Sequence, residues 1–181
     1  MKLTHPKEFY KNYIADSIVD AVDTKIVQAI ENLFAPDSIF EFGCGSGKNL
    51  MLAQEWAREN RSARIETCGQ DISPLNCLNA HMRGVDSVII GDERHMPMRK
   101  FDVCFTVSVL DHIPPENIEQ VVGNLQAMAT NGVVIAESEM NDPENFYWDH
   151  DYSAWGFVQL SQVRSEEDGS IYVIWVWSCA E

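Results

Sequence analysis

The 181-residue sequence predicts an α/β protein with a doubly wound, three-layer arrangement around a sheet that is mostly parallel. Two observations predict this class. Short apolar, strand-like runs alternate with helix-like runs between residues 36 and 137, and strands separated by helices pair in parallel. Residues 156–164 and 170–178 are two β-like runs joined by a polar turn, so the sheet is expected to end in an antiparallel hairpin.

The first elements of this pattern lead into and out of a glycine-rich turn. Apolar residues at helical spacing predict a helix over residues 6–34, which Pro36 ends. Ser73 and Pro74 form an N-cap and first-position pair for a later helix. The expected elements here are a strand at 39–42, a helix at 48–60, a strand at 63–69 and a helix at 73–82.

The second half of the chain continues the alternation. The run at 101–109 is apolar enough to be buried on both faces of a parallel sheet. Pro115 opens a helix, and Asn131 and Gly132 follow its end. The expected elements are strands at 87–90 and 101–109, a helix at 115–130 and a strand at 133–137. The apolar run at 171–177 is compatible with an interior strand or with an interface, so the oligomeric state stays open.

Composition excludes several classes of protein. The 28 acidic and 13 basic residues give a net charge of −15, which repels phosphate backbones and makes nucleic acid an unexpected partner. No apolar run approaches the ~20 residues that span a bilayer, and the first residues lack the apolar stretch of a signal peptide. We therefore expect a cytoplasmic protein without a membrane segment. Five scattered cysteines without a CxxC pair predict neither disulfides nor a structural zinc site.

The glycine-rich turn reads E-x-G-x-G-x-G over residues 41–47, between a strand and a helix. A phosphate-binding P-loop requires GxxxxGK[ST], but Phe42 occupies its first glycine position and Asn49 its last position. A dinucleotide fingerprint requires glycine where Lys48 stands. The motif resembles the first motif of the class I S-adenosylmethionine-dependent methyltransferases, which implies a Rossmann-like fold and this cofactor, with S-adenosylhomocysteine as the product.

The resemblance extends through residue 114. Asp71, in GQDISP, matches the acidic residue that contacts the ribose, and Asp92 matches the one near adenine. Glu41 is expected to face the ammonium group of the cofactor, whose carboxylate would meet free N–H groups at a helix N-terminus. Together the resemblance implies a cofactor site formed by Glu41, Gly43, Cys44, Gly45, Gly47, Asp71, Ile72, Asp92, Glu93 and Val107.

His112 is the leading candidate for a catalytic base. It follows the fourth predicted strand, and its ordinary pKa suits the removal of a proton from a hydroxyl or amine. The alternative is that His112 only shapes the loop before Pro114. Asp111 is a second catalytic candidate, which can orient His112 or contact the cofactor.

An aromatic and acidic segment follows the fifth predicted strand, where open α/β sheets hold their substrate loops. We expect substrate contacts from Tyr13, Glu137, His150 and Tyr152, although aromatic residues of this segment can equally pack as a short amphipathic helix. A metal site at Asp92 and His95 is not expected because a complete ligand set is missing. The motifs of amino-methylating and cytosine-methylating DNA enzymes are absent as well.

Residues 101–181 also resemble, in pattern, the compact methylases linked to pseudaminic acid and related surface-sugar biosynthesis. The chain is expected to form one domain over 1–181, with a helical cap at 1–35, a cofactor-binding core at 36–137, and a substrate loop and hairpin at 138–181. The expected reaction is methyl transfer to a hydroxyl or amine of a small polar metabolite, with a sugar derivative among the candidates. The alternatives are a protein or peptide methyltransferase and a noncatalytic, cofactor-binding partner subunit.

Overall fold

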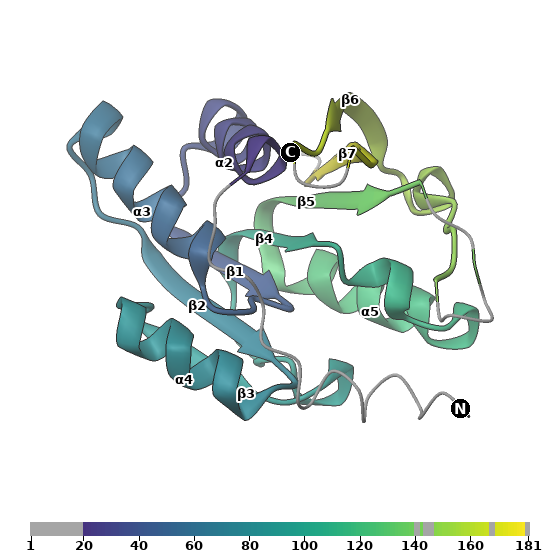
Figure 1. The fold of residues 1–181 in the computed structure, drawn as a ribbon, viewed down its shortest axis with the longest axis horizontal. Helices are drawn as coiled ribbons and strands as arrows, with labels where there is room; N and C mark the ends of the chain where they lie inside the picture. Colours follow the sequence, from purple (N-terminus) through teal and green to yellow (C-terminus); the bar gives the residue numbers. More distant parts are fainter. Residues whose placement is uncertain (1–19, 140–141, 143–146, 167–168, 180–181) are drawn as a thin grey trace.

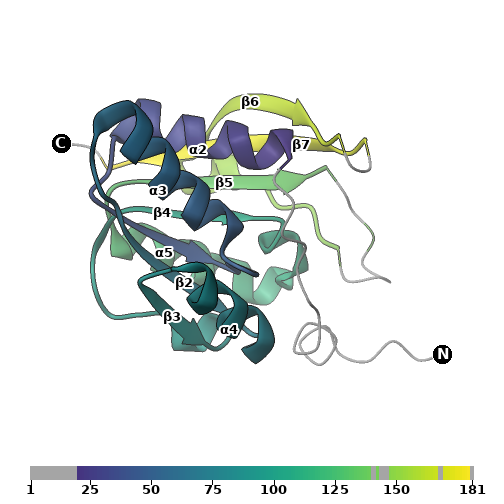
Figure 2. The same ribbon diagram turned by 60° about the vertical axis from the view of Figure 1, so that its left-hand side comes forward.

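The computed structural model describes residues 20–139, 142, 147–166 and 169–179, so the predicted contact at Tyr13 lies outside the described residues. These residues form a seven-stranded sheet in the order β3-β2-β1-β4-β5-β7-β6, with helices on both faces (Figures 1 and 2). The predicted α/β class with a mostly parallel sheet is confirmed.

Five strands pair in parallel, β7 runs antiparallel to them, and β6 runs antiparallel to β7 and so in the same direction as the other five. The parallel strands are β1 (Ser38–Phe42), β2 (Glu66–Asp71), β3 (Ser87–Ile90), β4 (Phe101–Val107) and β5 (Ala129–Ser138). The predicted hairpin is present as β6 (Val158–Arg164) and β7 (Ile171–Ser178), and β7 pairs antiparallel with β5. The apolar run at 171–177 is therefore an interior strand, and β6 and β3 are the two outer strands of the sheet.

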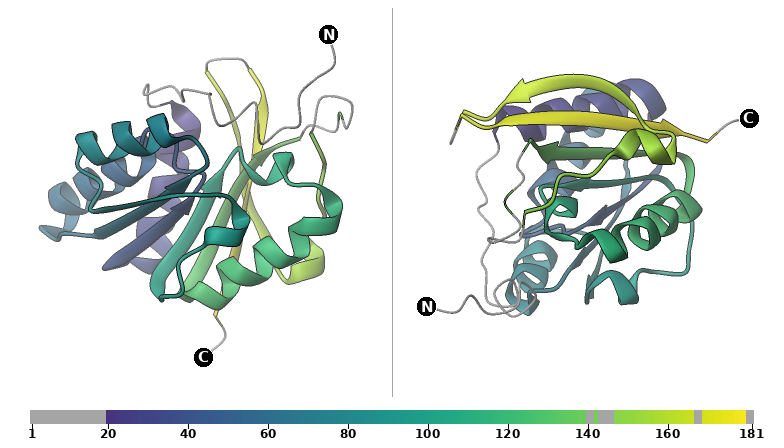
Figure 3. Two further views of the ribbon diagram at one scale, coloured as in Figure 1. Left: turned by 90° about the horizontal axis from the view of Figure 1, so that it is seen from below. Right: turned by 90° about the vertical axis from the view of Figure 1, so that its right-hand side faces the viewer.

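Each helix covers the sheet with its apolar face. The helices α2 (Ala21–Phe34), α3 (Lys48–Arg61) and α4 (Pro74–Arg83) contribute buried residues to one apolar cluster with the sheet, and α5 (Pro115–Met128) contributes to the other (Figure 3). Asp20 caps α2 in a capping box with Asp23, and Ser73 caps α4 as predicted. Each of the two clusters contains strand residues, so the sheet is buried on both faces.

Several predicted boundaries were wrong. The helix predicted over residues 6–34 is interrupted at Asp20, which is extended and caps α2, so α2 begins at Ala21. β2 starts at Glu66 instead of residue 63, because its pairing with β1 begins at Ser38 and Glu66. β4 ends at Val107 instead of 109, because Ser108 turns the backbone with φ 54°. The helix predicted to reach residue 130 ends at Met128, since Ala129 already pairs with Phe101 as the start of β5.

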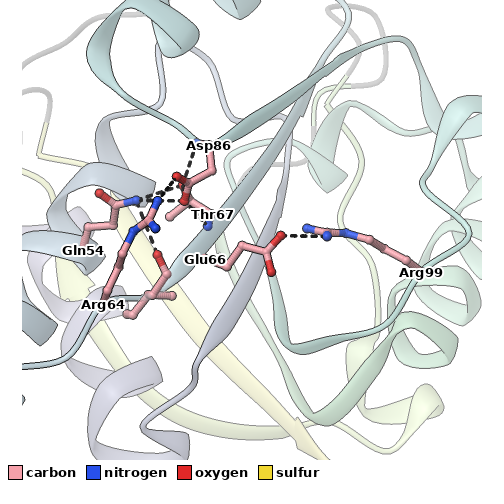
Figure 4. A network of polar contacts seen from close by, with 7 residues as sticks. Gln54, Arg64, Glu66, Thr67, Asp86 and Arg99 are labelled. Carbon is pink, nitrogen blue, oxygen red and sulfur yellow. Dashed lines mark hydrogen bonds and ion pairs between the residues drawn. The ribbon is translucent and has the colours of Figure 1, made fainter.

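Polar side chains tie together the edge of the sheet where the parallel strands begin, which we call the amino edge. Asp86 accepts hydrogen bonds from the backbone N–H and hydroxyl of Thr67, and its carboxylate also contacts Gln54 and Arg64 (Figure 4). Partial burial raises the pKa of Asp86, but the hydrogen bonds from Thr67 and the nearby Arg64 outweigh this effect, so the pKa is lowered. This edge is therefore held by polar groups that satisfy each other.

No helix in the described part of the chain is both long and apolar enough to cross a membrane. All five cysteines are free thiols; four are buried, and Cys179 is exposed. Burial raises the pKa of Cys44 well above its ordinary value, which suits a small apolar packing residue rather than a nucleophile.

Candidate functional site

The glycine-rich loop joins β1 to α3 at the opposite edge of the sheet, the carboxyl edge, where the parallel strands end. Gly43, Gly45 and Gly47 all have left-handed backbones, with φ values of 75°, 52° and 78°. At Gly43 a Cβ atom would lie 2.2 Å from Cγ2 of Val109, in the segment after β4. A side chain is therefore excluded there by both conformation and space.

Asp71, at the end of β2, fixes this loop. Its Oδ2 accepts a hydrogen bond from the backbone N–H of Gly45 at 2.9 Å, and its Oδ1 accepts from the N–H of Ser73 at 2.8 Å and from Asn76. Burial raises the pKa of Asp71, and these hydrogen bonds oppose the shift. A carboxylate can accept about four hydrogen bonds, so capacity remains for a ligand hydroxyl.

Glu41 lies beneath the loop and is 1% exposed. Its Oε1 accepts a hydrogen bond from Asn49 Nδ2 at 2.7 Å, whereas its Oε2 and the Oδ1 of Asn49 are buried without a hydrogen-bond partner. Burial raises the pKa of Glu41 well above its ordinary value. Two adjacent residues thus each retain a buried acceptor without a donor, a costly arrangement that a bound donor would relieve.

The acidic residue after β3 is already engaged. Asp92 caps a short turn at Glu93–His95, and its carboxylate contacts the Arg94 guanidinium at 2.6 Å and His95 Nδ1 at 2.9 Å. If the Asp92 carboxylate also contacts adenine, it does so while it remains bound to Arg94 and His95. Among the described residues, no group of three His, Cys, Asp or Glu side chains gathers as a metal site.

The remaining predicted cofactor residues lie at the same edge. Ile72 follows β2, Glu93 follows β3, and Val107 ends β4; all three are half-buried, whereas Cys44 is buried within the loop. The structure thus brings the predicted cofactor residues to the ends of four neighbouring parallel strands. Their contacts with a cofactor stay a prediction. Asn49 was missed, and its only sequence signal was a polar residue in the first turn of α3.

The turn after β4, Leu110–His112, is held by two of the residues predicted to bind substrate. The Glu137 carboxylate accepts hydrogen bonds from the backbone N–H groups of Val109 and Leu110 at 3.0–3.2 Å. His150 Nε2 lies 3.0 Å from the carbonyl oxygens of Leu110 and Ile113. Both side chains are buried, so in this structure they position the turn.

Asp111 and His112 project from this turn as an acid–base pair. Asp111 is 3% exposed; its Oδ2 accepts a hydrogen bond from the Ser138 hydroxyl at 3.3 Å, and its Oδ1 lies 3.6 Å from His112 Nε2. Burial raises the pKa of Asp111, and His112 opposes that shift. The His112 ring packs against Tyr147 with 4.5 Å between ring centroids. Ser138 and Tyr147 were not among the predicted site residues.

Tyr152, the last predicted substrate contact, lies inside an aromatic cluster. It is 3% exposed and packs against His150, Trp155, Phe157 and Trp175. Burial and the nearby Glu137 raise the pKa of its hydroxyl. These contacts are those of a packing residue that supports the turn through His150.

Comparison with known families adds a specific match. Residues 40–136 match the family model of a methyltransferase domain, which is more than half of the chain. The matched part begins in β1 and ends within β5, so it contains the glycine loop, Asp71 and the turn after β4. No curated protein matches the sequence.

Solved structures with the same fold are distant in sequence. The N-methyltransferase NodS from Bradyrhizobium japonicum WM9, in complex with S-adenosylhomocysteine, has a TM-score of 0.74 at 11% identity, covering 98% of this chain and 100% of that one. Magnesium protoporphyrin IX methyltransferase from Synechocystis PCC 6803, with bound S-adenosylmethionine, has a TM-score of 0.68 at 14% identity, with coverages of 97% and 95%. The 1,6-didemethyltoxoflavin-N1-methyltransferase from Burkholderia thailandensis has a TM-score of 0.68 at 13% identity, with coverages of 89% and 79%.

Proposed function

The chain belongs to the methyltransferase domain family, the class I S-adenosylmethionine-dependent enzymes, and we propose that it methylates a hydroxyl or an amine of a small polar metabolite. The observation that carries the proposal is the glycine loop, whose left-handed residues are tied to Asp71 above the buried acceptors of Glu41 and Asn49. A donor set and an acceptor set of this kind suit a ligand with a carboxylate, an ammonium and a ribose.

The residues at the carboxyl edge fit the cofactor. The Oε2 of Glu41 and the Oδ1 of Asn49 offer acceptors to its ammonium, directly or through water. Asp71 offers its remaining acceptor capacity to a ribose hydroxyl, and the start of α3 offers N–H groups to the carboxylate. When bound, the cofactor supplies a methyl group that its positive sulfur has already activated.

His112 would then receive the proton that the acceptor loses. Its Nε2 lies 3.6 Å from Asp111 Oδ1, so a carboxylate lies beside the ring that would take up the proton. Glu137 and His150 hold the backbone of the same turn, so they act as positioning residues in this proposal. The pair therefore links proton removal to a rigidly held turn.

Two lines of support favour a small molecule as the acceptor. The solved structures with this fold include enzymes named for magnesium protoporphyrin IX and 1,6-didemethyltoxoflavin. The net charge of −15 opposes binding to nucleic acid. The looser resemblance of residues 101–181 to surface-sugar methylases keeps a sugar derivative among the candidate acceptors.

A substitution at His112 tests the proposed chemistry. His112→Ala should lower kcat by about 100-fold or more, the usual contribution of a positioned base, while cofactor affinity stays unchanged. The rate is measured as transfer of a labelled methyl group from S-adenosylmethionine into a small-molecule extract, and affinity by calorimetry. An unchanged kcat would leave His112 with a purely structural role.

A further inference from the structure

The two halves of the chain differ sharply in their charged residues. Residues 20–100, which include the cofactor half of the carboxyl edge, contain nine basic and twelve acidic residues. Residues 101–163 contain no lysine or arginine and ten acidic residues: Asp102, Asp111, Glu116, Glu119, Glu137, Glu139, Asp142, Glu144, Asp149 and Asp151. The segment that forms the acceptor side of the site therefore lacks any permanent positive charge.

Asp111 places one of these charges at the proposed site of reaction. It is 3% exposed, and its Oδ1 accepts no hydrogen bond; the approach of His112 Nε2, at 3.6 Å, is longer than a hydrogen bond. A buried carboxylate oxygen without a donor is costly, and a ligand that brings a donor or a positive charge would relieve that cost. Glu137 is buried nearby, and burial, followed by the charge of Asp111, raises the pKa of its carboxyl well above the ordinary value.

One aromatic ring and one backbone contact of the neighbouring segment lie at the same turn. The Tyr147 ring packs against His112, and the backbone N–H of Trp148 donates to the carbonyl oxygen of Asp111. Carboxylates and aromatic faces are the groups that proteins use to bind ammonium ions. Two basic residues at the same edge are already paired, Lys48 with Asp23 at 2.8 Å and Arg94 with Asp92 at 2.6 Å.

We propose that the methyl acceptor is an amine that Asp111 binds in its ammonium form beside Tyr147, and that phosphorylated or carboxylated metabolites are poor acceptors. This inference rests on the proposed methyltransferase function and narrows its hydroxyl-or-amine acceptor to one class. An anion would meet the Asp111 carboxylate with no lysine or arginine from residues 101–163 to offset the repulsion.

The reaction then balances with groups that are present. The bound ammonium gives one proton to neutral His112, which leaves a lone pair on nitrogen. That pair forms the new N–C bond to the methyl group while the C–S bond breaks and its electrons remain on sulfur. The product is a methylammonium ion, and the proton on His112 passes to solvent.

The class of acceptor is tested by separating a small-molecule extract on ion-exchange resins at neutral pH. Each fraction is incubated with the full-length protein and labelled S-adenosylmethionine. Label should enter the fraction that a cation exchanger retains, and N-acetylation of that fraction with acetic anhydride should abolish the transfer. Label that enters only the anionic or the neutral fraction would overturn the amine assignment; the anionic result would point to Lys2, Lys7 and Lys11, which lie outside the described residues.

The two proposals fail in different ways. If no fraction accepts label although calorimetry shows that the protein binds S-adenosylmethionine, the proposed transferase activity itself fails. With an active amine, Asp111→Asn should raise the acceptor KM at least about tenfold, the range expected for losing one member of a buried charge pair, without changing cofactor affinity. Glu119→Gln, an exposed substitution on α5, is the matched control and should leave KM unchanged. An unchanged KM for folded Asp111→Asn would contradict the role of Asp111.

Discussion

The two edges of the sheet use their polar residues differently. At the amino edge the carboxylate of Asp86 accepts from Thr67, Gln54 and Arg64, and Asp102 accepts from the backbone N–H groups of Asp37 and Ser38. At the carboxyl edge buried acceptors lack donors: Glu41 Oε2, Asn49 Oδ1, Gln70 Oε1, Thr106 Oγ1 and Asp111 Oδ1. In the described part of the chain the sixth such atom is Glu31 Oε1. The other carboxylate oxygen of Glu31, Oε2, forms an ion pair with Arg61.

This difference separates polar groups that stabilise the fold from polar groups that await a ligand. The pKa of Asp86 is lowered by its partners despite partial burial, whereas burial raises the pKa values of Glu41, Asp71 and Asp111. Burial that raises the pKa values of several ionisable groups at one edge is typical of functional sites. Substitutions at the amino edge should therefore mainly change stability, whereas substitutions at the carboxyl edge should mainly change cofactor binding.

The largest effect is expected at the glycine loop. Gly43→Ala adds a Cβ that would overlap Val109 and forces a left-handed alanine, so it should cost about 3 kcal/mol of combined strain and repacking. Unfolding free energy and cofactor affinity should both fall, measured by denaturant titration and calorimetry. Gly123→Ala on α5 is the matched control; its Cβ would meet nothing within 4 Å, and the helix should gain roughly 0.5–1 kcal/mol. Equal behaviour of the two variants would contradict the close packing of the loop.

A smaller effect, mainly on binding, is expected at Asp71. Asp71→Ala removes the acceptor of the Gly45 N–H and the proposed ribose contacts, so cofactor affinity should fall by about 10- to 100-fold. Asp102→Ala, which also removes an acceptor of two backbone N–H groups, should lower stability and leave affinity unchanged. Calorimetry on both folded variants distinguishes the edges. A loss of affinity in Asp102→Ala alone would reverse the assignment of the site.

The smallest effects have opposite signs. Glu41→Gln removes a buried carboxylate, so it should stabilise the free protein by about 1 kcal/mol while weakening cofactor binding. Asp86→Asn should destabilise the protein by roughly 1 kcal/mol with no effect on binding, because it weakens satisfied hydrogen bonds. Denaturant titrations near neutral pH compare the two variants with the parent protein, and stabilisation by both substitutions would remove the distinction between the edges.

The pH dependence of the stability contributed by Glu41 and by Asp86 follows from the direction of each pKa shift. Because the pKa of Glu41 is raised in the folded state, its carboxyl reduces stability as the pH rises from 4.5, its ordinary value, through the folded pKa. The advantage of Glu41→Gln should therefore vanish at acidic pH. Asp86 has a lowered pKa, so its contribution is present above 3.8 and is lost as the pH falls through the folded pKa.

The sequence predicted where the glycine loop and Asp71 lie in the fold better than it predicted the surroundings of Glu137 and His150. The E-x-G-x-G-x-G motif and Asp71 lie at fixed places relative to strand ends, so local patterns were enough to bring them to one edge. Glu137 and His150 were expected to face substrate, but the structure shows that they bind backbone atoms of residues 109–113. Such contacts join residues that are about 27 to 40 positions apart in sequence, and no local pattern reports them.

Element boundaries failed for the same physical reason. The start of β5 at Ala129 depends on pairing with Phe101 in β4, which the helical appearance of residues 115–130 conceals. The interior place of β7 likewise depends on its pairing with both β5 and β6. Apolarity indicated that residues 171–177 form a strand, but only the order of strands in the sheet shows that β6, and not β7, is an outer strand.

Binding of the methyl donor is the most direct test of the central claim. Titration of the folded, full-length protein with S-adenosylmethionine and S-adenosylhomocysteine should give saturable binding of one cofactor per chain, and Asp71→Ala should weaken it. The contradictory result is a protein that unfolds cooperatively, and is therefore folded, yet takes up neither compound at concentrations up to about 1 mM, an affinity limit near −4 kcal/mol.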